Sequence, residues 1–351
     1  MIFKNKMDLT KFIGYYSDST GKEGFYTRDE MKELNLAPDS FFCHSLHYSR
    51  GVFEGIRAVW DAQSEELFYV VLEQHLRRLK RGSTSTLLMD VDTKHLHEVI
   101  DELVRKNIES GFINPKEGCY IRPLVYKDKQ FDQEEKQVHG LGVYSQDHQT
   151  VLTISLFPWG AYLEQPPRIR VHESGVACCL RKYKTTSNYG FGGFAKDLAK
   201  LNGFDEALIT DPSPERNVLE GGGENVFLIT NGWVVTPSTA QDILPGTKRA
   251  ILLEMFRNYG IEVEERKIPL DEFLKGDAAL FTGTAAGVIP IKSVDDPLTG
   301  RKKEFDLGHR LRSPGLDLKH LEQQYQRMIH GEPVDVVHQD LQRKIRTLVP
   351  L

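Results

Sequence analysis

Two kinds of hydrophobic pattern alternate along this chain, and together they predict an α/β (α+β) fold of two lobes. Residues 66–71 and 120–126 are rich in the aromatic and β-branched side chains that strands favour. Between them, the apolar residues of 96–104 recur at helical spacing, and Gly111 follows. The polar residues 130–150 predict a surface loop. A chain of 351 residues with 40% hydrophobic content can bury a full core, and its length favours two domains over one.

The predicted boundary between the lobes lies where prolines interrupt regular structure. Pro158 ends an apolar strand over 151–157, and Pro166 and Pro167 follow shortly after it. We therefore predict an N-terminal α/β lobe over 1–157, an interdomain linker over 158–167, a C-terminal lobe over 168–330 and a C-terminal tail over 331–351. The tail mixes charges with scattered valines and leucines, and its sequence does not indicate whether it packs.

The second lobe has clear local signals. Two β-rich runs at 225–230 and 233–236 flank Asn231-Gly232, which is a strong hairpin signal. Apolar residues at helical spacing predict a helix from about residue 247 to 259, just before a glycine, and a second helix over 318–328.

Composition excludes several classes of function. Lysine and arginine number 45 and aspartate and glutamate 50, so the net charge of −5 offers no general attraction to nucleic acid or to an anionic membrane. We find no secretion signal and no stretch near the roughly 18 apolar residues of a membrane span. The four cysteines show no C-x-x-C spacing, so we interpret them as reduced thiols of a cytoplasmic protein.

Three segments of the second half could approach a ligand, although each alone is a weak signal. Residues 244–249, Leu-Pro-Gly-Thr-Lys-Arg, place a turn before a helix whose first N–H groups can bind phosphate. Residues 220–225, Glu-Gly-Gly-Gly-Glu-Asn, put a carboxylate beside a backbone that a flat ligand can approach closely. Residues 282–287, Thr-Gly-Thr-Ala-Ala-Gly, end a strand with two hydroxyls. An ordinary helix start, a flexible loop and a simple strand end are the alternative interpretations.

Two lysines and two histidines are further candidates. Lys182 and Lys184 lie in a hydroxyl-rich segment, and the pattern does not choose between them; a solvated surface lysine is the common alternative. His44 and His47 lack Asp, Glu or Cys partners at ligand spacing, so a structural pair is favoured over a metal site, and we predict no metal. The chain contains no H-E-x-x-H, G-x-S-x-G or Walker-type phosphate motif.

The order of these segments resembles the fold-type IV enzymes that use pyridoxal 5'-phosphate (PLP), and most closely the branched-chain amino acid aminotransferases. The resemblance extends over residues 42–288. In the first half it rests on His-Ser-Leu-His-Tyr at 44–48, Val-Phe-Glu-Gly-Ile-Arg at 52–57, His-Leu-Arg-Arg-Leu at 75–79, Tyr-Ile-Arg-Pro-Leu at 120–124 and Phe-Pro-Trp-Gly-Ala-Tyr at 157–162. It continues with Lys184 ahead of Asn188-Tyr189 and with the three ligand-approaching segments.

The resemblance implies a fold-type IV PLP enzyme of two mixed α/β lobes, with the cofactor in the cleft between them and the C-terminal lobe anchoring it. Lys184 rather than Lys182 would form the Schiff base, because it lies at the family's distance ahead of Asn188-Tyr189. Glu220 would pair with the pyridine nitrogen and Tyr189 with the ring oxygen. The cofactor phosphate would be held by the side chains of Arg78 and Thr284 and by the amides of Thr247 and Lys248.

The activity that the resemblance implies is ping-pong transamination between a branched-chain L-amino acid (leucine, isoleucine or valine) and 2-oxoglutarate through a pyridoxamine form. Arg122, beside Tyr120, matches the arginine that accepts the distal carboxylate of glutamate, and the amides of Thr284 and Ala285 would bind the α-carboxylate. The apolar pocket for the substrate side chain would be formed by Tyr48, Phe53, Trp159 and Tyr162. Family members are at least dimeric, so we expect a homo-oligomer with small-molecule substrates and with no nucleic-acid or membrane partner.

Two departures from the family pattern bear on substrate choice. Ser49-Arg50-Gly51 stands where the family has small neutral residues, and the added cation could bias the enzyme toward acidic or polar substrates. Gly287 replaces a residue that is usually larger. The alternatives are D-amino acid aminotransferase or aminodeoxychorismate lyase chemistry on the same fold, and a non-catalytic binding protein. The Tyr-Ile-Arg-Pro-Leu and Phe-Pro-Trp-Gly-Ala-Tyr segments argue against the first two, and the intact cofactor residues against the third.

Overall fold

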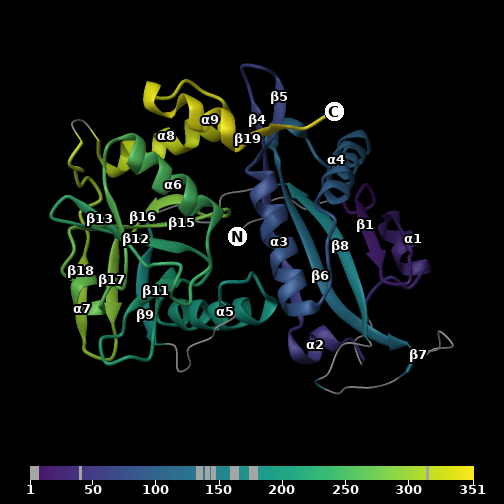
Figure 1. The fold of residues 1–351 in the computed structure, drawn as a ribbon, viewed down its shortest axis with the longest axis horizontal. Helices are drawn as coiled ribbons and strands as arrows, with labels where there is room; N and C mark the ends of the chain where they lie inside the picture. The colour runs from purple at the N-terminus through teal and green to yellow at the C-terminus, as the bar shows by residue number, and fades with distance from the viewer. Residues whose placement is uncertain are drawn as a thin grey trace. The chain divides into compact units, whose positions relative to one another are not determined.

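The computed structural model describes residues 8–38, 42–131, 137–138, 143, 148–158, 166–173, 181–313 and 316–351. The chain divides into two compact units, which Figure 1 colours along the sequence. The first unit comprises Met1–Gly160, Tyr183–Ser187 and Arg346–Leu351, and the second comprises Ala161–Lys182 and Asn188–Ile345. Because residues 159–165 lie outside the described residues, the linker over 158–167 stays a prediction.

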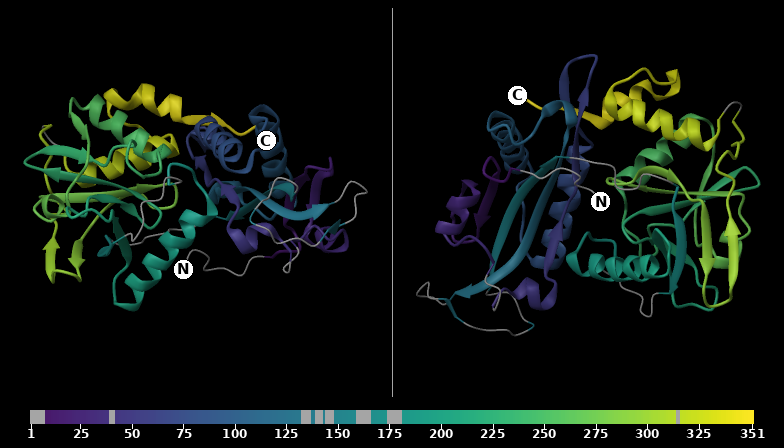
Figure 2. Two further views of the ribbon diagram at one scale, coloured as in Figure 1. Left: turned by 60° about the horizontal axis from the view of Figure 1, so that its bottom comes forward. Right: turned by 180° about the vertical axis from the view of Figure 1, so that it is seen from behind.

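One antiparallel sheet forms the centre of the first unit. Its strand order is β19-β5-β4-β6-β8-β1-β2, and β3 and β7 also pair with β6. Strands β6 and β8 run side by side over most of their length (Figures 1 and 2). The strands are β1 (Ile13–Asp18), β2 (Glu23–Thr27), β3 (Gly51–Phe53), β4 (Ile56–Asp61), β5 (Glu66–Val70), β6 (Cys119–Phe131), β7 (Gln137–Val138), β8 (His148–Pro158) and β19 (Arg346–Leu348).

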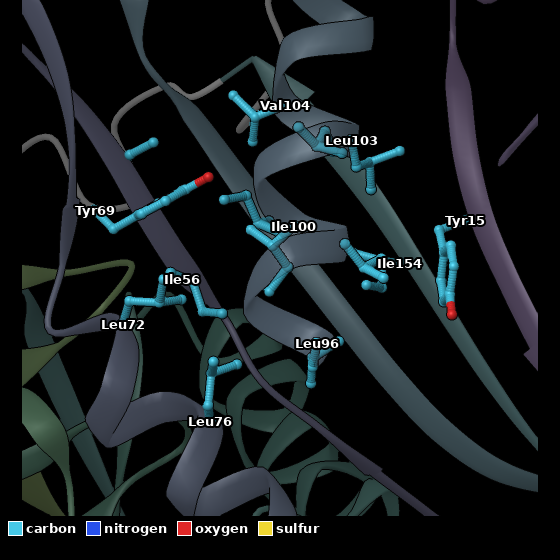
Figure 3. Packing of buried hydrophobic residues seen from close by; sticks show 14 of the residues in the cluster. Tyr15, Ile56, Tyr69, Leu72, Leu76, Leu96, Ile100, Leu103, Val104 and Ile154 are labelled. Atoms are coloured by element: carbon cyan, nitrogen blue, oxygen red, sulfur yellow. The ribbon is translucent and has the colours of Figure 1, made fainter. Parts of the chain in front are cut away.

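The core of the first unit lies where helices cover this sheet. Its helices are α1 (Arg28–Glu33), α2 (His44–Tyr48), α3 (Leu72–Leu87), α4 (Thr93–Glu109) and the short 3-10 helix η1 (Pro115–Glu117). Helix α4 begins at Asp92, whose carboxylate accepts hydrogen bonds from two backbone amides of the first turn. Figure 3 shows Ile100 and Leu103 of α4 in the same cluster as Ile154 of the sheet. Burial stabilises the fold by about 1.5–3 kcal/mol for each such side chain.

Two five-stranded sheets form the second unit, in the orders β11-β10-β9-β17-β18 and β14-β13-β12-β15-β16. Buried side chains from both sheets belong to one apolar cluster, which makes this cluster the core of the unit. The strands are β9 (Arg168–Glu173), β10 (Glu206–Thr210), β11 (Val218–Gly221), β12 (Asn225–Thr230), β13 (Trp233–Thr236), β14 (Val263–Glu265), β15 (Ala278–Gly283), β16 (Gly287–Pro290), β17 (Ser293–Asp296) and β18 (Arg301–Glu304).

The remaining helices follow or connect these strands. They are α5 (Thr186–Leu201), α6 (Thr247–Asn258), α7 (Leu270–Phe273), α8 (Leu318–His330), the 3-10 helix η2 (Val336–His338) and α9 (Gln339–Ile345). Helices α8 and α9, yellow in Figures 1 and 2, contact each other. Within the described part of the chain, no helix has the length and apolar character needed to cross a membrane.

Most of the helices and strands predicted from local sequence are present in the structure, but one predicted loop has the wrong bounds. The predicted hairpin strands coincide with β12 and β13, and the predicted helix at 247 coincides with α6 to within a residue. The predicted surface loop over 130–150 is too long, because β6 extends to Phe131 and β8 begins at His148. Backbone pairing of Gln130 with His148 extends the ladder through polar residues that carry no strand signal of their own.

The C-terminal tail, which the sequence left open, is packed. Its helix α9 belongs to the second unit, and β19 belongs to the first, where it pairs antiparallel with β5. Arg346 of β19 donates to the buried carboxylate of Asp61 at 2.5 Å. The last residues therefore complete one edge of the sheet in the first unit.

Two glycines of the first unit provide a test of strand placement. Gly118 has φ +70° and ψ −179°, a region that only glycine adopts readily, and a Cβ there would lie 2.5 Å from the backbone oxygen of Ala58 in β4. Gly111 has φ +73°, but a Cβ there would meet only the distant end of Lys11 at 3.8 Å. We expect Gly111→Ala to lower the free energy of unfolding by about 1–2 kcal/mol, and Gly118→Ala to lower it further.

Urea denaturation of the two variants beside the wild type measures this difference. Equal losses of stability would mean that the backbone of β4 does not lie against Gly118.

Candidate active site

Lys184 lies in the first unit because a short backbone pairing attaches its segment to β3. The amide of Phe53 donates to the carbonyl of Lys184 at 3.0 Å, and Val52 forms an antiparallel bridge with Thr185. Thr186 adds a hydrogen bond of 2.8 Å from its hydroxyl to the carbonyl of Ser49. These contacts hold Lys184 beside residues that precede it by more than a hundred positions.

The structure distinguishes the two candidate lysines. Lys182 is exposed, whereas Lys184 is half-buried and places its Nζ atom 5.0 Å from the centre of the Phe53 ring. Of the two, Lys184 is thus the lysine that is partly removed from water and that lies against a residue of the first unit.

Around Phe53, the first unit gathers two of the other side chains that the resemblance implied for substrate binding, Tyr120 and Arg122. The guanidinium carbon of Arg122 lies 4.5 Å from the centre of the Phe53 ring and 5.2 Å from that of Tyr120. Arg122 also donates from Nη2 to the Tyr120 hydroxyl at 2.9 Å. Burial raises the pKa of Tyr120, while the neighbouring Arg122 acts in the opposite direction, so this phenol stays protonated at neutral pH. A Cβ on Gly55 would collide with the Tyr120 hydroxyl, which explains the glycine there.

Tyr48 and Arg50, which precede Phe53 in the sequence, make other contacts. Tyr48 lies at the end of α2, 37% exposed, and its ring packs 4.7 Å from the buried His44. His44 in turn stacks at 4.5 Å against the ring of His148. Arg50 donates from Nη2 to the carbonyl of Thr86 at 2.6 Å, in the last turn of α3, where carbonyls lack helical partners. The side chain of Arg50 therefore caps the C-terminal end of α3.

Arg78 is held by a buried carboxylate that the sequence did not single out. Its Nε and Nη2 atoms donate to the two oxygens of Glu54 at 2.6 and 2.8 Å, and His75 Nδ1 lies 2.7 Å from the same carboxylate. Burial alone would raise the pKa of Glu54, but the charge and hydrogen bonds of Arg78, together with His75, outweigh it and hold the pKa well below its usual range.

In the second unit, Glu220 lies in β11, one residue before its end, and both of its carboxylate oxygens accept hydrogen bonds. Oε2 accepts from the amide of Leu244 at 3.0 Å, and Oε1 accepts from Nη1 of Arg181 at 3.5 Å. Arg181 is 5% exposed and lies 5.0 Å from the ring centre of Phe191. The carboxylate is thus oriented by a buried cation and tied to the segment that precedes α6.

The three glycines after Glu220 allow other backbone segments to come close. A Cβ on Gly192 of α5 would collide with the carbonyl of Gly222, and one on Gly283 would lie 3.4 Å from the carbonyl of Gly223. The ring of Tyr189 lies 3.7 Å from the position of a Cβ on Gly223. The end of β15 and the start of α5 therefore meet at this loop, together with Glu220.

The N-terminus of α6 is attached to the same loop. Asn225 donates to the carbonyl of Leu244 at 2.9 Å, and a Cβ on Gly246 would collide with the Asn225 side chain. Thr247 and Lys248, the first two residues of α6, are buried. Thr284 and Ala285 are half-buried in the tight turn from β15 to β16, which closes with Gly287 at φ +70°. The second unit thus brings together Tyr189, Glu220, Thr247, Lys248, Thr284 and Ala285 within a few connected segments.

Two predicted residues, Trp159 and Tyr162, lie outside the described residues, and their contribution to the pocket stays a prediction. Conversely, sequence reasoning did not single out Glu54, Arg181 or Glu224, three buried ionisable residues next to the predicted ones. The available signal was a charged residue inside an otherwise apolar or glycine-rich motif, as at 52–57 and 220–225. That signal marks a buried charge but does not name its partner.

Comparison with known proteins identifies the family. A family model for amino-transferase class IV matches residues 51–294. The probable branched-chain-amino-acid aminotransferase of Aquifex aeolicus is 30% identical over 282 residues, 76% of this chain and 85% of that protein. The branched-chain-amino-acid aminotransferase of Pseudomonas aeruginosa is 31% identical over 297 residues, 82% of this chain and 90% of that protein.

Solved structures agree with this similarity. The branched-chain aminotransferase of the archaeon Thermoproteus uzoniensis, determined with norvaline, matches with a TM-score of 0.75 and 27% identity, covering 96% of this chain and all of that one. A second branched-chain amino acid aminotransferase, from T.th. and complexed with N-(5'-phosphopyridoxyl)-L-glutamate, matches with a TM-score of 0.73 and 26% identity over 96% of this chain and 98% of that one.

The chain belongs to the class IV aminotransferases, which depend on PLP and act on small-molecule amino acids and 2-oxo acids. The relatives that it matches within this family are branched-chain aminotransferases. The predictions of family, mixed α/β fold, enzyme class and cofactor are therefore confirmed.

Glu224 beside this site has a perturbed ionisation that can be tested. It is buried, and its Oε2 accepts from the amide of Gly223 at 3.0 Å. Burial and then the negative charge of Glu206 raise the pKa of Glu224 to about 8, against the opposing charge of Lys196, which pairs with Glu206.

We expect Glu224→Gln to change the pH dependence of stability. The unfolded chain loses the Glu224 proton near an ordinary carboxyl pKa of about 4.5, whereas the folded protein keeps it until about 8, so this group disfavours the folded state increasingly over that interval. The glutamine variant lacks this titration, and its free energy of unfolding should improve relative to the wild type as the pH rises from about 5 to about 8.

Urea unfolding of both proteins at several pH values measures the difference. A constant offset between the two curves would show that Glu224 ionises in the folded protein as it does in the unfolded chain.

Proposed function

We propose that this enzyme transfers the amino group between a branched-chain L-amino acid (leucine, isoleucine or valine) and 2-oxoglutarate, with Lys184 as the lysine that binds PLP and moves the proton. The observation that carries the proposal is the grouping of Lys184, Phe53, Tyr120 and Arg122 in the first unit. This grouping places an amine that can act as a base beside an apolar surface and a cation that could bind a second carboxylate.

The residues that the structure describes fit PLP by their chemistry. Lys184 offers an amine, and Glu220 offers a carboxylate held by Arg181 and by a backbone amide. For the phosphate, Arg78 offers a guanidinium, the start of α6 offers backbone N–H groups, and Thr284 offers a hydroxyl. The proposed ligands are distributed over both units.

PLP, when bound, supplies an electron sink for the bond to the substrate Cα. Lys184 would remove the Cα proton and deliver it back, which requires its amine to be neutral at that moment. Glu220, whose carboxylate Arg181 orients, would stabilise a positive charge on the cofactor ring.

Substrate recognition would combine two modes in one place. The rings of Phe53 and Tyr120 favour an aliphatic side chain, and Arg122 between them could turn its donors to the distal carboxylate of glutamate or 2-oxoglutarate. The complexes of the related enzymes with norvaline and with a phosphopyridoxyl-glutamate adduct support both kinds of side chain. Arg50 is engaged by the end of α3, which argues against a role in selecting acidic substrates. We also propose that the enzyme is a homo-oligomer in the cytoplasm.

The test is the substrate preference of the wild type and of Arg122→Leu. Leucine, valine, glutamate, D-alanine and aminodeoxychorismate are mixed singly with the holoenzyme, and conversion of the PLP absorbance band to that of the pyridoxamine form is recorded. We expect conversion by leucine, valine and glutamate. In Arg122→Leu, the loss of a charge-assisted contact should reduce kcat/KM for glutamate by about 10-fold or more and that for leucine only slightly.

Arg122→Lys serves as the control that keeps the charge, and it should retain part of the glutamate activity. Conversion by D-alanine or aminodeoxychorismate alone would replace the proposed function with another activity of this fold. Equal losses for leucine and glutamate in Arg122→Leu would contradict the role of Arg122.

A further inference from the structure

Glu54, His75 and Arg78 form a buried charged cluster whose presence needs an explanation. Glu54 and His75 are fully buried and Arg78 is 8% exposed. Burying an ion pair costs several kcal/mol of desolvation per ion, and apolar residues of similar size often give equal or greater stability. A buried pair of this kind is therefore poor evidence for a stabilising role, and its geometry is the better guide to its purpose.

The elements around the cluster leave little room for other arrangements. Glu54 follows β3 directly, and its amide donates to the carbonyl of Pro123 at 3.0 Å, which fixes its backbone. His75 and Arg78 are three residues apart on α3 and so share one face of that helix. A Cβ on Gly82 would lie 2.7 Å from Val52 Cγ1, so α3 runs close against β3.

The contacts of Glu54 set the orientation of the Arg78 guanidinium. One carboxylate oxygen accepts from Nε at 2.6 Å and the other from Nη2 at 2.8 Å, a two-point contact that fixes the plane of the group. His75 Nδ1 lies 2.7 Å from the second oxygen and limits rotation of the carboxylate. The N–H groups of Nη1 then point in a direction set by Glu54, on the side of the guanidinium away from it.

We propose that Glu54 is a positioning residue that orients Arg78 toward the phosphate group of the cofactor. The inference rests on the proposed function, in which Arg78 binds that phosphate. Glu54 contributes direction rather than charge, because its own negative charge offsets part of the attraction between Arg78 and a phosphate. Removing it would leave a cation that is buried but no longer held in one orientation.

The test compares PLP with pyridoxal, which lacks the phosphate, as ligands of the apo-protein. Absorbance titrations give the dissociation constants of both for the wild type, Glu54→Gln and Arg78→Gln. The glutamine at position 54 can accept with one atom only, and its amide N–H groups face the donors of Arg78. We expect Glu54→Gln to weaken PLP binding by about 10-fold or more, because Arg78 loses a charge-assisted hydrogen bond to position 54 that orients it. Pyridoxal binding should stay within about twofold of the wild type.

Two further variants make the result interpretable. Glu102→Gln removes a half-buried carboxylate that also pairs with an arginine, Arg105, in the first unit, and it should change neither constant. If Glu54→Gln fails to fold, as judged by circular dichroism, Glu54→Asp keeps the charge but shortens the side chain, and it should still weaken PLP selectively.

The outcomes separate this inference from the proposed function. Equal weakening of PLP and pyridoxal in the folded Glu54 variants, or no weakening of either, would overturn the inference. If Arg78→Gln weakens PLP selectively and the Glu54 variants do not, the inference fails while the phosphate role of Arg78 stands. If Arg78→Gln leaves PLP binding unchanged, the proposed phosphate site itself is wrong.

Discussion

Three consecutive residues, the last of β3 and the two that connect it to β4, impose the constraint on which the first unit's part of the site depends. The amide of Phe53 donates a hydrogen bond to the carbonyl of Lys184, and the Phe53 ring lies against the side chains of Lys184 and Arg122. Glu54 holds Arg78, and Gly55 leaves the space that the Tyr120 hydroxyl occupies. Because successive side chains of an extended chain point to opposite faces, Phe53 and Glu54 can serve two different groups at once. A shift of this segment by one residue would therefore remove Lys184, Arg78, Arg122 and Tyr120 from their contacts with it at the same time.

In the second unit, glycines allow the segments around Glu220 to lie close together. Glu220 lies near the end of β11, is oriented by Arg181, and is tied to the segment that precedes α6. This close approach requires glycine at positions 192 and 246, since a side chain there would collide with the carbonyl of Gly222 or with Asn225. The chain passes from the first unit to the second within α5, just after Lys184. Lys184 and Tyr189 are thereby fixed in different units although only five residues separate them.

Local signals were sufficient for much of the fold, whereas the roles predicted for the site residues came from the resemblance to a family. The Asn231-Gly232 turn places β12 and β13, and the Pro-Gly turn places the start of α6, because each depends on a few neighbouring residues. The choice between Lys182 and Lys184 needed a resemblance to a family, since exposure is set by the distant β3. Glu54 with Arg78, and Arg181 with Glu220, could not be predicted as pairs, because nothing in either local pattern encodes a contact across 24 or 39 residues. The polar ends of β6 and β8 were missed for the same reason, as their pairing is tertiary.

The central claim is that Lys184 is the lysine to which the cofactor attaches. Reduction of the holoenzyme with borohydride, followed by proteolysis and mass spectrometry of the peptides, tests it most directly. We expect the phosphopyridoxyl group on Lys184 alone, given its half-buried place against Phe53 and the exposure of Lys182. Attachment at Lys182 or at the buried Lys248, or no attachment after saturation with PLP, would contradict the claim.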